Sequence, residues 1–251
     1  MNNNIPFLKE LVIREFSEPN TITLYRKKAL EGLWIGESEI ISRYFTKKYA
    51  TVLDLGCGSG RTTIPLHALG FRVTGVDLTE AMIRTAKEIA SSENLDISYQ
   101  IGDATALVFE DNSFDYILFS NQGWTQIPGK ENRLTALKEM RRVLKPGGIL
   151  VFTAHPRWLN REFGLFWSWQ WVRFHILKKV GFSIPEQDYG DRFFERETEF
   201  ASRQFIHIPS VKEVKKLIHE SGLQELEINL ELQISEKDIR KNPPVFYLCQ
   251  K

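Results

Sequence analysis

The sequence predicts a doubly wound α/β fold: a single domain with a mostly parallel, seven-stranded sheet and an aromatic-rich insertion after the fifth strand. Two observations lead to this prediction. Short apolar runs alternate with helical patterns from residue 51 onward, an order that is typical of a parallel sheet covered by helices on both faces. A glycine-rich turn also follows the first apolar run, where such folds pass from strand to helix.

The composition is that of an ordinary globular domain. The chain has 251 residues, of which 42% are hydrophobic and 26% charged, and its formal net charge of +1 provides no overall field for nucleic acid or anionic lipid. Because it has neither an apolar run of about 18 residues nor a leader-like start, a cytoplasmic protein without a membrane partner is expected. Cys57 and Cys249 are expected to be reduced thiols.

Residues 1–50 are expected to form an N-terminal helical cap. The first twenty residues show no clear period and are interrupted by Pro6 and Pro19. From 21 to 45, apolar residues recur at helical spacing, and two glycines within this stretch leave one helix and two helices equally compatible with the pattern.

Residues 51–154 contain the alternating part of the sequence. Apolar runs predict five strands, at 51–55, 71–77, 97–101, 114–120 and 149–154. Helical patterns lie between them, at 61–69, at 79–89 and at 131–144. The repeated order of strand and helix predicts parallel pairing of these five strands.

Residues 155–208 break this rhythm and contain four of the six tryptophans. We favour a helix around Trp167 and Trp171 over a strand, followed by a hairpin of 192–194 and 204–208. The remaining segment, 209–251, is expected to form a C-terminal helix, 211–221, and a final pair of strands, 223–230 and 245–249.

The strongest chemical signal is the turn after the first strand. Its glycines, Gly56, Gly58 and Gly60, are spaced G-x-G-x-G, with Asp54 two positions before the first. Glycines at alternate positions let the backbone turn sharply and approach a ligand closely. The spacing differs from the G-x-G-x-x-G of dinucleotide sites, and an acid at this place suits an ammonium or sulfonium group better than phosphates.

These residues resemble the first motif of the class I S-adenosylmethionine-dependent methyltransferases, a family with a Rossmann-like fold. The resemblance extends, weakly between 155 and 208, to the end of the chain. It implies that Asp77 accepts from both ribose hydroxyls of S-adenosylmethionine and that Asp103 accepts from the adenine amino group. It further implies cofactor contacts from Tyr25, Asp54, Gly56, Gly58, Gly60, Arg61, Leu78, Met82, Gly102, Ala104, Ser120 and Asn121.

The sequence indicates fewer residues for the methyl acceptor than for the cofactor. Asn121 follows the fourth strand, where this family places groups beside the transferred methyl, and it is either an orienting residue or a turn cap. His155 and His207 are the candidate general bases, although a lone histidine near a strand end is more often structural. No metal site is expected.

The resemblance implies an enzyme that methylates N, O or C of a small molecule, acting as a monomer or homodimer. The alternatives are an RNA- or protein-directed methyltransferase and a non-catalytic S-adenosylmethionine-binding regulator; nucleic acid is not expected as a partner. We expect 155–208 to be a lid over the acceptor pocket, with its aromatic residues packed inside rather than exposed. Contact with nucleic acid or with a membrane surface is the alternative for this segment.

Overall fold

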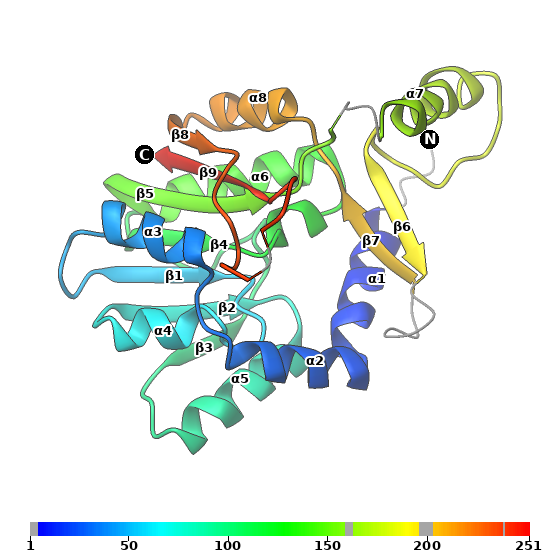
Figure 1. Cartoon of the computed structure of the whole chain (residues 1–251). Coiled ribbons are helices and arrows are strands. Elements are labelled where there is room, and N and C mark those ends of the chain that lie inside the picture. The colour runs from blue at the N-terminus through cyan, green and yellow to red at the C-terminus, as the bar shows by residue number, and fades with distance from the viewer. Residues whose placement is uncertain (1–4, 159–162, 196–202, 238) are drawn as a thin grey trace.

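The computed structural model describes residues 5–158, 163–195, 203–237 and 239–251. Its centre is a seven-stranded sheet (Figure 1). Its strands are β1 (Thr51–Leu55), β2 (Arg72–Asp77), β3 (Ser98–Ile101), β4 (Phe114–Phe119), β5 (Leu144–Ala154), β8 (Gln224–Asn229) and β9 (Val245–Gln250). The spatial order is β3-β2-β1-β4-β5-β9-β8.

The strand pairing confirms the predicted doubly wound sheet. β1 to β5 pair in parallel, whereas β9 pairs antiparallel with both β5 and β8. The order reverses at β1, which has β2 on one side and β4 on the other, and ligands of open α/β sheets bind at such a switch point. The glycine-rich turn therefore lies at the position where the topology alone would place a site.

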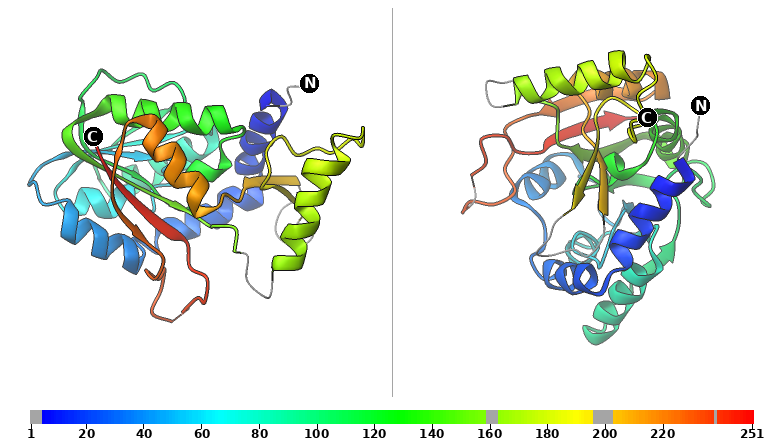
Figure 2. Two further views of the ribbon diagram at one scale, coloured as in Figure 1. Left: turned by 90° about the horizontal axis from the view of Figure 1, so that it is seen from above. Right: turned by 90° about the vertical axis from the view of Figure 1, so that its right-hand side faces the viewer.

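Helices cover both faces of the sheet (Figure 2). They are α3 (Ile35–Tyr44), α4 (Thr63–Ala68), α5 (Glu80–Ser92), α6 (Lys130–Val143) and α8 (Val211–Ser221). The helix α2 (Pro19–Ala29) packs against α5, and a short 3-10 helix, η1 (Gly123–Gln126), follows β4. The strands alternate between two cores: Leu53 packs in the core beneath α6 and α8, whereas its neighbour Val52 packs in the core beneath α3. This division follows from the two-residue period of a strand.

The first helix, α1 (Ile5–Ser17), lies in the expected N-terminal helical cap, in the part where the sequence shows no clear period. Pro6 lies in its first turn, where backbone N–H groups have no intrahelical acceptor, so the missing N–H of proline costs no hydrogen bond. Leu8, Leu11 and Val12 are buried at helical spacing, against Phe205 of the insertion. The helix is thus stabilised by a contact with a residue nearly two hundred positions away, which short-range periodicity does not reveal.

The insertion consists of a helix and a hairpin, as predicted. Its elements are α7 (Gly164–Val172), a π-helical turn η2 (Arg173–Leu177), and the antiparallel pair β6 (Asp191–Glu195) and β7 (Arg203–His207). The hairpin stands against α1, and α7 projects at the edge of the molecule (Figure 1). Within the described residues, no helix has the length and apolarity needed to cross a membrane.

Candidate functional site

A cavity opens at the carboxyl ends of the parallel strands. Its walls come from α1 and α2, from the loops after β1 to β4, and from η1. The described residues that line it are Lys9, Val12, Phe16, Tyr25, Leu55, Gly56, Gly58, Asp77, Leu78, Thr79, Gly102, Asp103, Ala104, Thr105, Phe119, Ser120, Asn121, Gly123, Gln126, Ile127, Pro128 and Asn132.

Most of the residues that the sequence analysis predicted to bind the cofactor line the cavity. Ten of them line it: Tyr25, Gly56, Gly58, Asp77, Leu78, Gly102, Asp103, Ala104, Ser120 and Asn121. Arg61 lines a smaller neighbouring cavity, whose walls also include Tyr25, Gly58 and Asn121. The strand ends therefore bring residues from four loops to one place.

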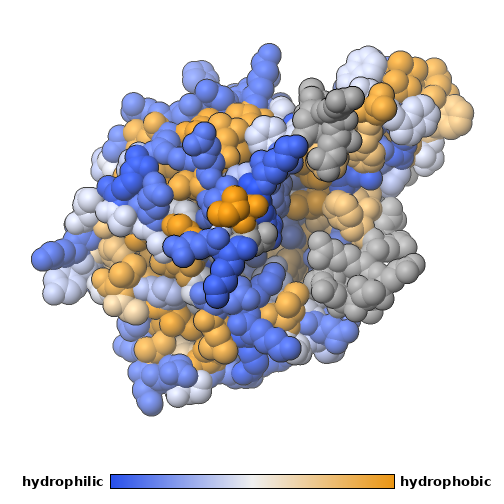
Figure 3. Space-filling view, in the orientation of Figure 1, coloured by the Kyte–Doolittle hydropathy of each residue, from blue (hydrophilic) through white to orange (hydrophobic). Residues whose placement is uncertain are grey.

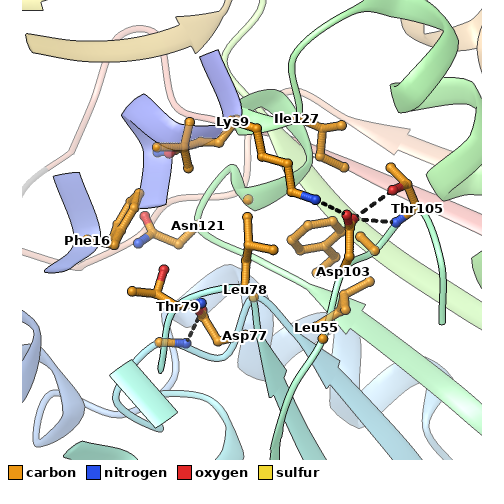
Figure 4. A pocket seen from close by; sticks show the side chains of 18 of the residues that line it. Lys9, Phe16, Leu55, Asp77, Leu78, Thr79, Asp103, Thr105, Asn121 and Ile127 are labelled. Atoms are coloured by element: carbon orange, nitrogen blue, oxygen red, sulfur yellow. Dashed lines mark hydrogen bonds and ion pairs between the residues drawn. The ribbon is translucent and has the colours of Figure 1, made fainter. Parts of the chain in front are cut away.

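Asp77 is held in a fixed orientation at the floor of the cavity (Figure 4). One carboxylate oxygen accepts from the backbone N–H of Thr79 at 2.8 Å, and the other accepts from that of Gly58 at 2.9 Å. Burial raises the pKa of this carboxyl group above its ordinary value, although the two N–H groups act in the opposite direction. The Thr79 side chain also hydrogen-bonds this carboxylate, which faces the cavity.

Asp103 lies on the adjacent wall and is bound by α1. Its Oδ2 lies 2.5 Å from Lys9 Nζ, and its Oδ1 accepts from the backbone N–H and the hydroxyl of Thr105 at 2.8 Å (Figure 4). Burial opposes ionisation of Asp103, but the hydrogen bonds from Lys9 and Thr105 outweigh it, so that the pKa lies below its ordinary value. Lys9 and Ile127 lie across the cavity from Asp77 and Thr79 (Figure 4).

Asn121 and Tyr25 form a second polar pair at the cavity. Asn121 adopts a left-handed backbone conformation, with φ of 46°, which asparagine tolerates better than most residues. Its side chain hydrogen-bonds the Tyr25 hydroxyl. Burial, followed by the charges of Glu15 and Asp77, raises the pKa of Tyr25 to about 12, so this hydroxyl stays protonated at neutral pH.

Asp54 was predicted to face the ligand, but it does not line the cavity. It is 1% exposed, and its Oδ2 accepts from the hydroxyls of Thr62 and Thr63 at 2.7 and 2.5 Å. Desolvation raises its pKa to about 6. Asp54 therefore fixes the start of α4 beneath the glycine turn.

Gly60 and Met82 also lie outside the cavity lining. Gly60 has a φ of 97°, and a Cβ there would lie 2.8 Å from the Tyr99 hydroxyl, so this glycine is required for the turn and its packing. Met82 is fully buried, with its sulfur 3.4 Å from the hydroxyl of Ser59. Neither position can contact a ligand without displacing the surrounding chain.

Arg61 faces the smaller cavity but already has strong partners. Its guanidinium donates to both carboxylate oxygens of Glu37 at 2.8 and 2.7 Å, and to the carbonyl of Gly32 at 2.9 Å. Glu37, which the sequence analysis missed, is fully buried and also accepts from the backbone N–H of Trp34 and from the Ser120 hydroxyl. Glu37 of α3 therefore connects this helix both to Arg61, in the turn after β1, and to Ser120, in the loop after β4.

Neither candidate general base lies at the cavity. Burial, followed by the charge of Arg240, lowers the pKa of His155 to about 4, but the residue does not line the pocket. His207 is fully buried, with Nδ1 2.8 Å from Asp191 and Nε2 2.9 Å from Glu213. Because both of its ring nitrogens face carboxylates, His207 is a structural residue.

The insertion does not form the wall that we expected. None of its described residues lines the cavity; instead, Lys9, Val12 and Phe16 of α1 form part of its wall. The hairpin supports α1 from behind, through Phe205 and Phe193. The sequence analysis found no helical period in α1, the helix that forms this part of the wall. The apolar residues Leu8, Leu11 and Val12 were the signal that could have predicted it.

Comparisons with known proteins agree with this geometry. Residues 52–148 match the family model described as a methyltransferase domain. A demethylmenaquinone methyltransferase of Staphylococcus aureus is 35% identical over 184 residues, covering 70% of this chain and 68% of the relative.

Solved structures are similar over most of the chain. An S-adenosylmethionine-dependent methyltransferase from Methanosarcina mazei has a TM-score of 0.68 at 25% identity, covering 84% of this chain and 96% of that one. The Burkholderia thailandensis 1,6-didemethyltoxoflavin-N1-methyltransferase, solved with S-adenosylhomocysteine, has a TM-score of 0.57 at 16% identity, covering 86% and 76%, and shows the shared fold. This chain belongs to the class I S-adenosylmethionine-dependent methyltransferases and is an enzyme that uses S-adenosylmethionine as its cofactor.

Proposed function

We propose that this enzyme transfers the methyl group to an apolar small molecule with a flat ring, of the quinone class. The observation that carries the proposal is that the cavity lining combines two unlike surfaces. Asp77 and the Lys9-bound Asp103 form a polar wall, and the side chains of Val12, Phe16 and Ile127 form an apolar wall. A polar cofactor and an apolar acceptor would each find a matching wall.

The polar wall fits S-adenosylmethionine. Asp77 has a half-buried carboxylate that lines the cavity, and a carboxylate can accept hydrogen bonds from two adjacent ribose hydroxyls. Gly58 has a φ of 54° and a Cβ there would point at the Tyr25 ring, 3.4 Å away, so a side chain would narrow the cleft. We assign the ribose to Asp77, the adenine to the wall formed by Leu78 and Asp103, and the amino acid end to the loop of Ser120.

The apolar wall fits a ring without charge. Phe16 packs edge-on against Tyr25, with centroids 5.5 Å apart, so an aromatic surface lines this end of the cavity. Among the polar groups, the Gln126 Oε1 atom is buried and accepts no hydrogen bond from the described residues, which leaves it for a hydroxyl or amine of the acceptor. The demethylmenaquinone methyltransferase similar to this chain supports a quinone-like acceptor.

Methyl transfer demands little acid–base chemistry from this chain. S-adenosylmethionine supplies a methyl group activated on a sulfonium centre, and the protein has to align the acceptor and exclude water. The cover formed by Phe16 and the Tyr25–Asn121 pair serve alignment and exclusion. The methyl group bonds to a ring carbon of the reduced quinol, S-adenosylhomocysteine leaves as a neutral thioether, and the proton of that ring carbon passes to water. The proposal therefore needs neither His155 nor His207 as a base.

The test is transfer of a labelled methyl group from S-adenosylmethionine to a demethylmenaquinone with a short side chain, kept in its reduced quinol form by dithionite so that the ring carbon is nucleophilic, compared with a hydrophilic catechol. We expect turnover of the quinone only. Ile127→Ser should raise the KM for the quinone about tenfold, because it removes apolar contact area, without changing the affinity for S-adenosylhomocysteine. Leu69→Ser, at a position that is 59% exposed and outside the cavity, is the matched control. Turnover of the catechol alone would contradict the proposal.

A further inference from the structure

The segment from Phe163 to Phe182 exposes an unusual amount of apolar surface. Exposed fractions are 88% for Leu165, 56% for Trp169, 48% for Trp171, 67% for Val180 and 62% for Phe182. We expected the aromatic residues of the insertion to be packed inside it. This expectation is wrong for the exposed residues of this segment, whereas Trp167, on the inner side of α7, is buried. A contiguous exposed patch of this kind marks an interaction surface.

The segment is amphipathic because its two sides have different partners. On the inner side, Trp167 is 4% exposed and packs edge-on against Tyr189, whose hydroxyl donates to the carbonyl of Trp167 at 3.0 Å. Arg157 stacks on both rings. On the outer side, Leu165, Trp169 and Ile176 recur at helical spacing along α7 and η2 and face outward.

The patch is also basic. Between Phe163 and Phe182 the sequence contains Arg173, Lys178 and Lys179 and no Asp or Glu. Arg173 pairs with Glu186 at 3.1 Å, whereas Lys178 lies over the Phe174 ring and donates to a backbone carbonyl. Among the described residues, neither Lys178 nor Lys179 has an ion pair with an acidic side chain, so both charges lie beside the exposed aromatic side chains.

The patch projects away from the rest of the molecule. α7 stands at the edge of the ribbon in three views, beyond the hairpin (Figures 1 and 2). In the space-filling view, apolar atoms gather at this corner (Figure 3). A flat surface could therefore contact the patch without meeting the sheet or its covering helices.

We propose that the patch docks the enzyme on the surface of an anionic phospholipid bilayer. Tryptophan and phenylalanine insert at the depth of the lipid head groups, and lysines beside them attract anionic lipid. Leu165, Ile176 and Val180 have no ring faces on which bases could stack, so nucleic acid fits the patch poorly. A second copy fits poorly as well, because two basic patches facing each other repel.

The test measures binding of the full chain to lipid vesicles by co-sedimentation. We expect binding to vesicles of phosphatidylcholine and phosphatidylglycerol, weakened by salt, and little binding to phosphatidylcholine alone. The double variant Leu165→Ser, Trp169→Ser should lose about tenfold in vesicle affinity, and Lys178→Gln with Lys179→Gln should lose the preference for anionic lipid.

The matched control is the double variant Leu30→Ser, Val108→Ser, at positions that are 80% and 79% exposed elsewhere on the surface. It should bind vesicles as the unmodified enzyme does, and all variants should keep their affinity for S-adenosylhomocysteine. Three results would overturn the proposal: no vesicle binding, binding that the patch variants leave unchanged, or an RNA complex or dimer that the patch variants abolish in place of vesicle binding.

Discussion

Asp77 is the residue on which cofactor affinity is expected to depend most. Its two oxygens hold the backbone N–H groups of Gly58 and Thr79 and face the cavity. Asp77→Ala should weaken binding of S-adenosylhomocysteine at least tenfold, since a charge-assisted hydrogen bond contributes about 1.5–3 kcal/mol. Titration calorimetry checks this, with the exposed Asp96→Ala as control. An unchanged affinity in a folded Asp77 variant would remove this residue from the site.

Asp54 predicts a dependence of stability on pH. Its pKa of about 6 in the folded chain exceeds the ordinary value of 3.8, so the folded state binds more protons between these values. The free energy of unfolding should therefore fall as pH rises from about 4 to 6. Asn keeps an oxygen that accepts from Thr62 and Thr63 but does not ionise.

We accordingly expect Asp54→Asn to gain stability relative to the unmodified protein between about pH 4.5 and pH 7. Urea unfolding at both pH values measures the difference, and Asp96→Asn, at an exposed position, is the control. Parallel pH profiles of the Asp54 variant and the unmodified protein would show that the carboxyl group is not desolvated.

At the scale of elements, α1 decides how the cavity is closed. One of its faces packs on the hairpin through Leu8 and Leu11, and Lys9 reaches across to Asp103. Both charged side chains are partly exposed, so the ion pair contributes only about 0–1 kcal/mol to global stability. Its effect should instead be local, on how often α1 opens.

Lys9→Met removes this ion pair but keeps a side chain of similar length. Amide hydrogens of α1 should exchange faster with solvent in the variant, whereas those of α6 should exchange at unchanged rates. Hydrogen exchange followed by mass spectrometry distinguishes these helices, and Lys27→Met, exposed on α2, is the control. Equal exchange of α1 in both variants would show that apolar packing alone holds this helix.

At the scale of the molecule, a network of charged groups joins the insertion to the main domain. Arg133 of α6 is fully buried and donates to Asp188 at 2.8 Å and to the carbonyl of Ile127 at 3.0 Å. Glu213 of α8 accepts from Arg157 at 3.3 Å and contacts His207. Ile127 lies in the cavity wall, so the network reaches the site.

Arg133→Met should lower the free energy of unfolding by about 3 kcal/mol, because it leaves Asp188 without its buried cation. Urea unfolding measures the loss, and Arg72→Met, exposed on β2, should change stability by less than about 0.5 kcal/mol. A small effect at Arg133 would mean that the insertion and the sheet are joined by apolar contacts alone.

The sequence by itself determined the sheet and one wall of the cavity. The strands and the turns after them are local features, and parallel strands place their carboxyl ends at one edge. Asp77, Asp103 and Asn121 were therefore brought together by strand order alone, as the lining of the cavity confirms. Short-range patterns did not determine which residues of these turns face the cavity. Asp54 points toward α4 because the hydroxyls of Thr62 and Thr63 donate to its carboxylate.

Only the tertiary structure decided what covers the cavity and what the insertion does. α1 is held by Phe205, and Lys9 meets a partner 94 residues away, so no short-range pattern could reveal either contact. The amino-acid composition of the insertion is the same whether its tryptophans are buried or exposed. Which tryptophans are buried depended on how much of their surface Tyr189 and the hairpin could cover. Local periodicity records which face of an element is apolar, whereas long-range packing decides what meets that face.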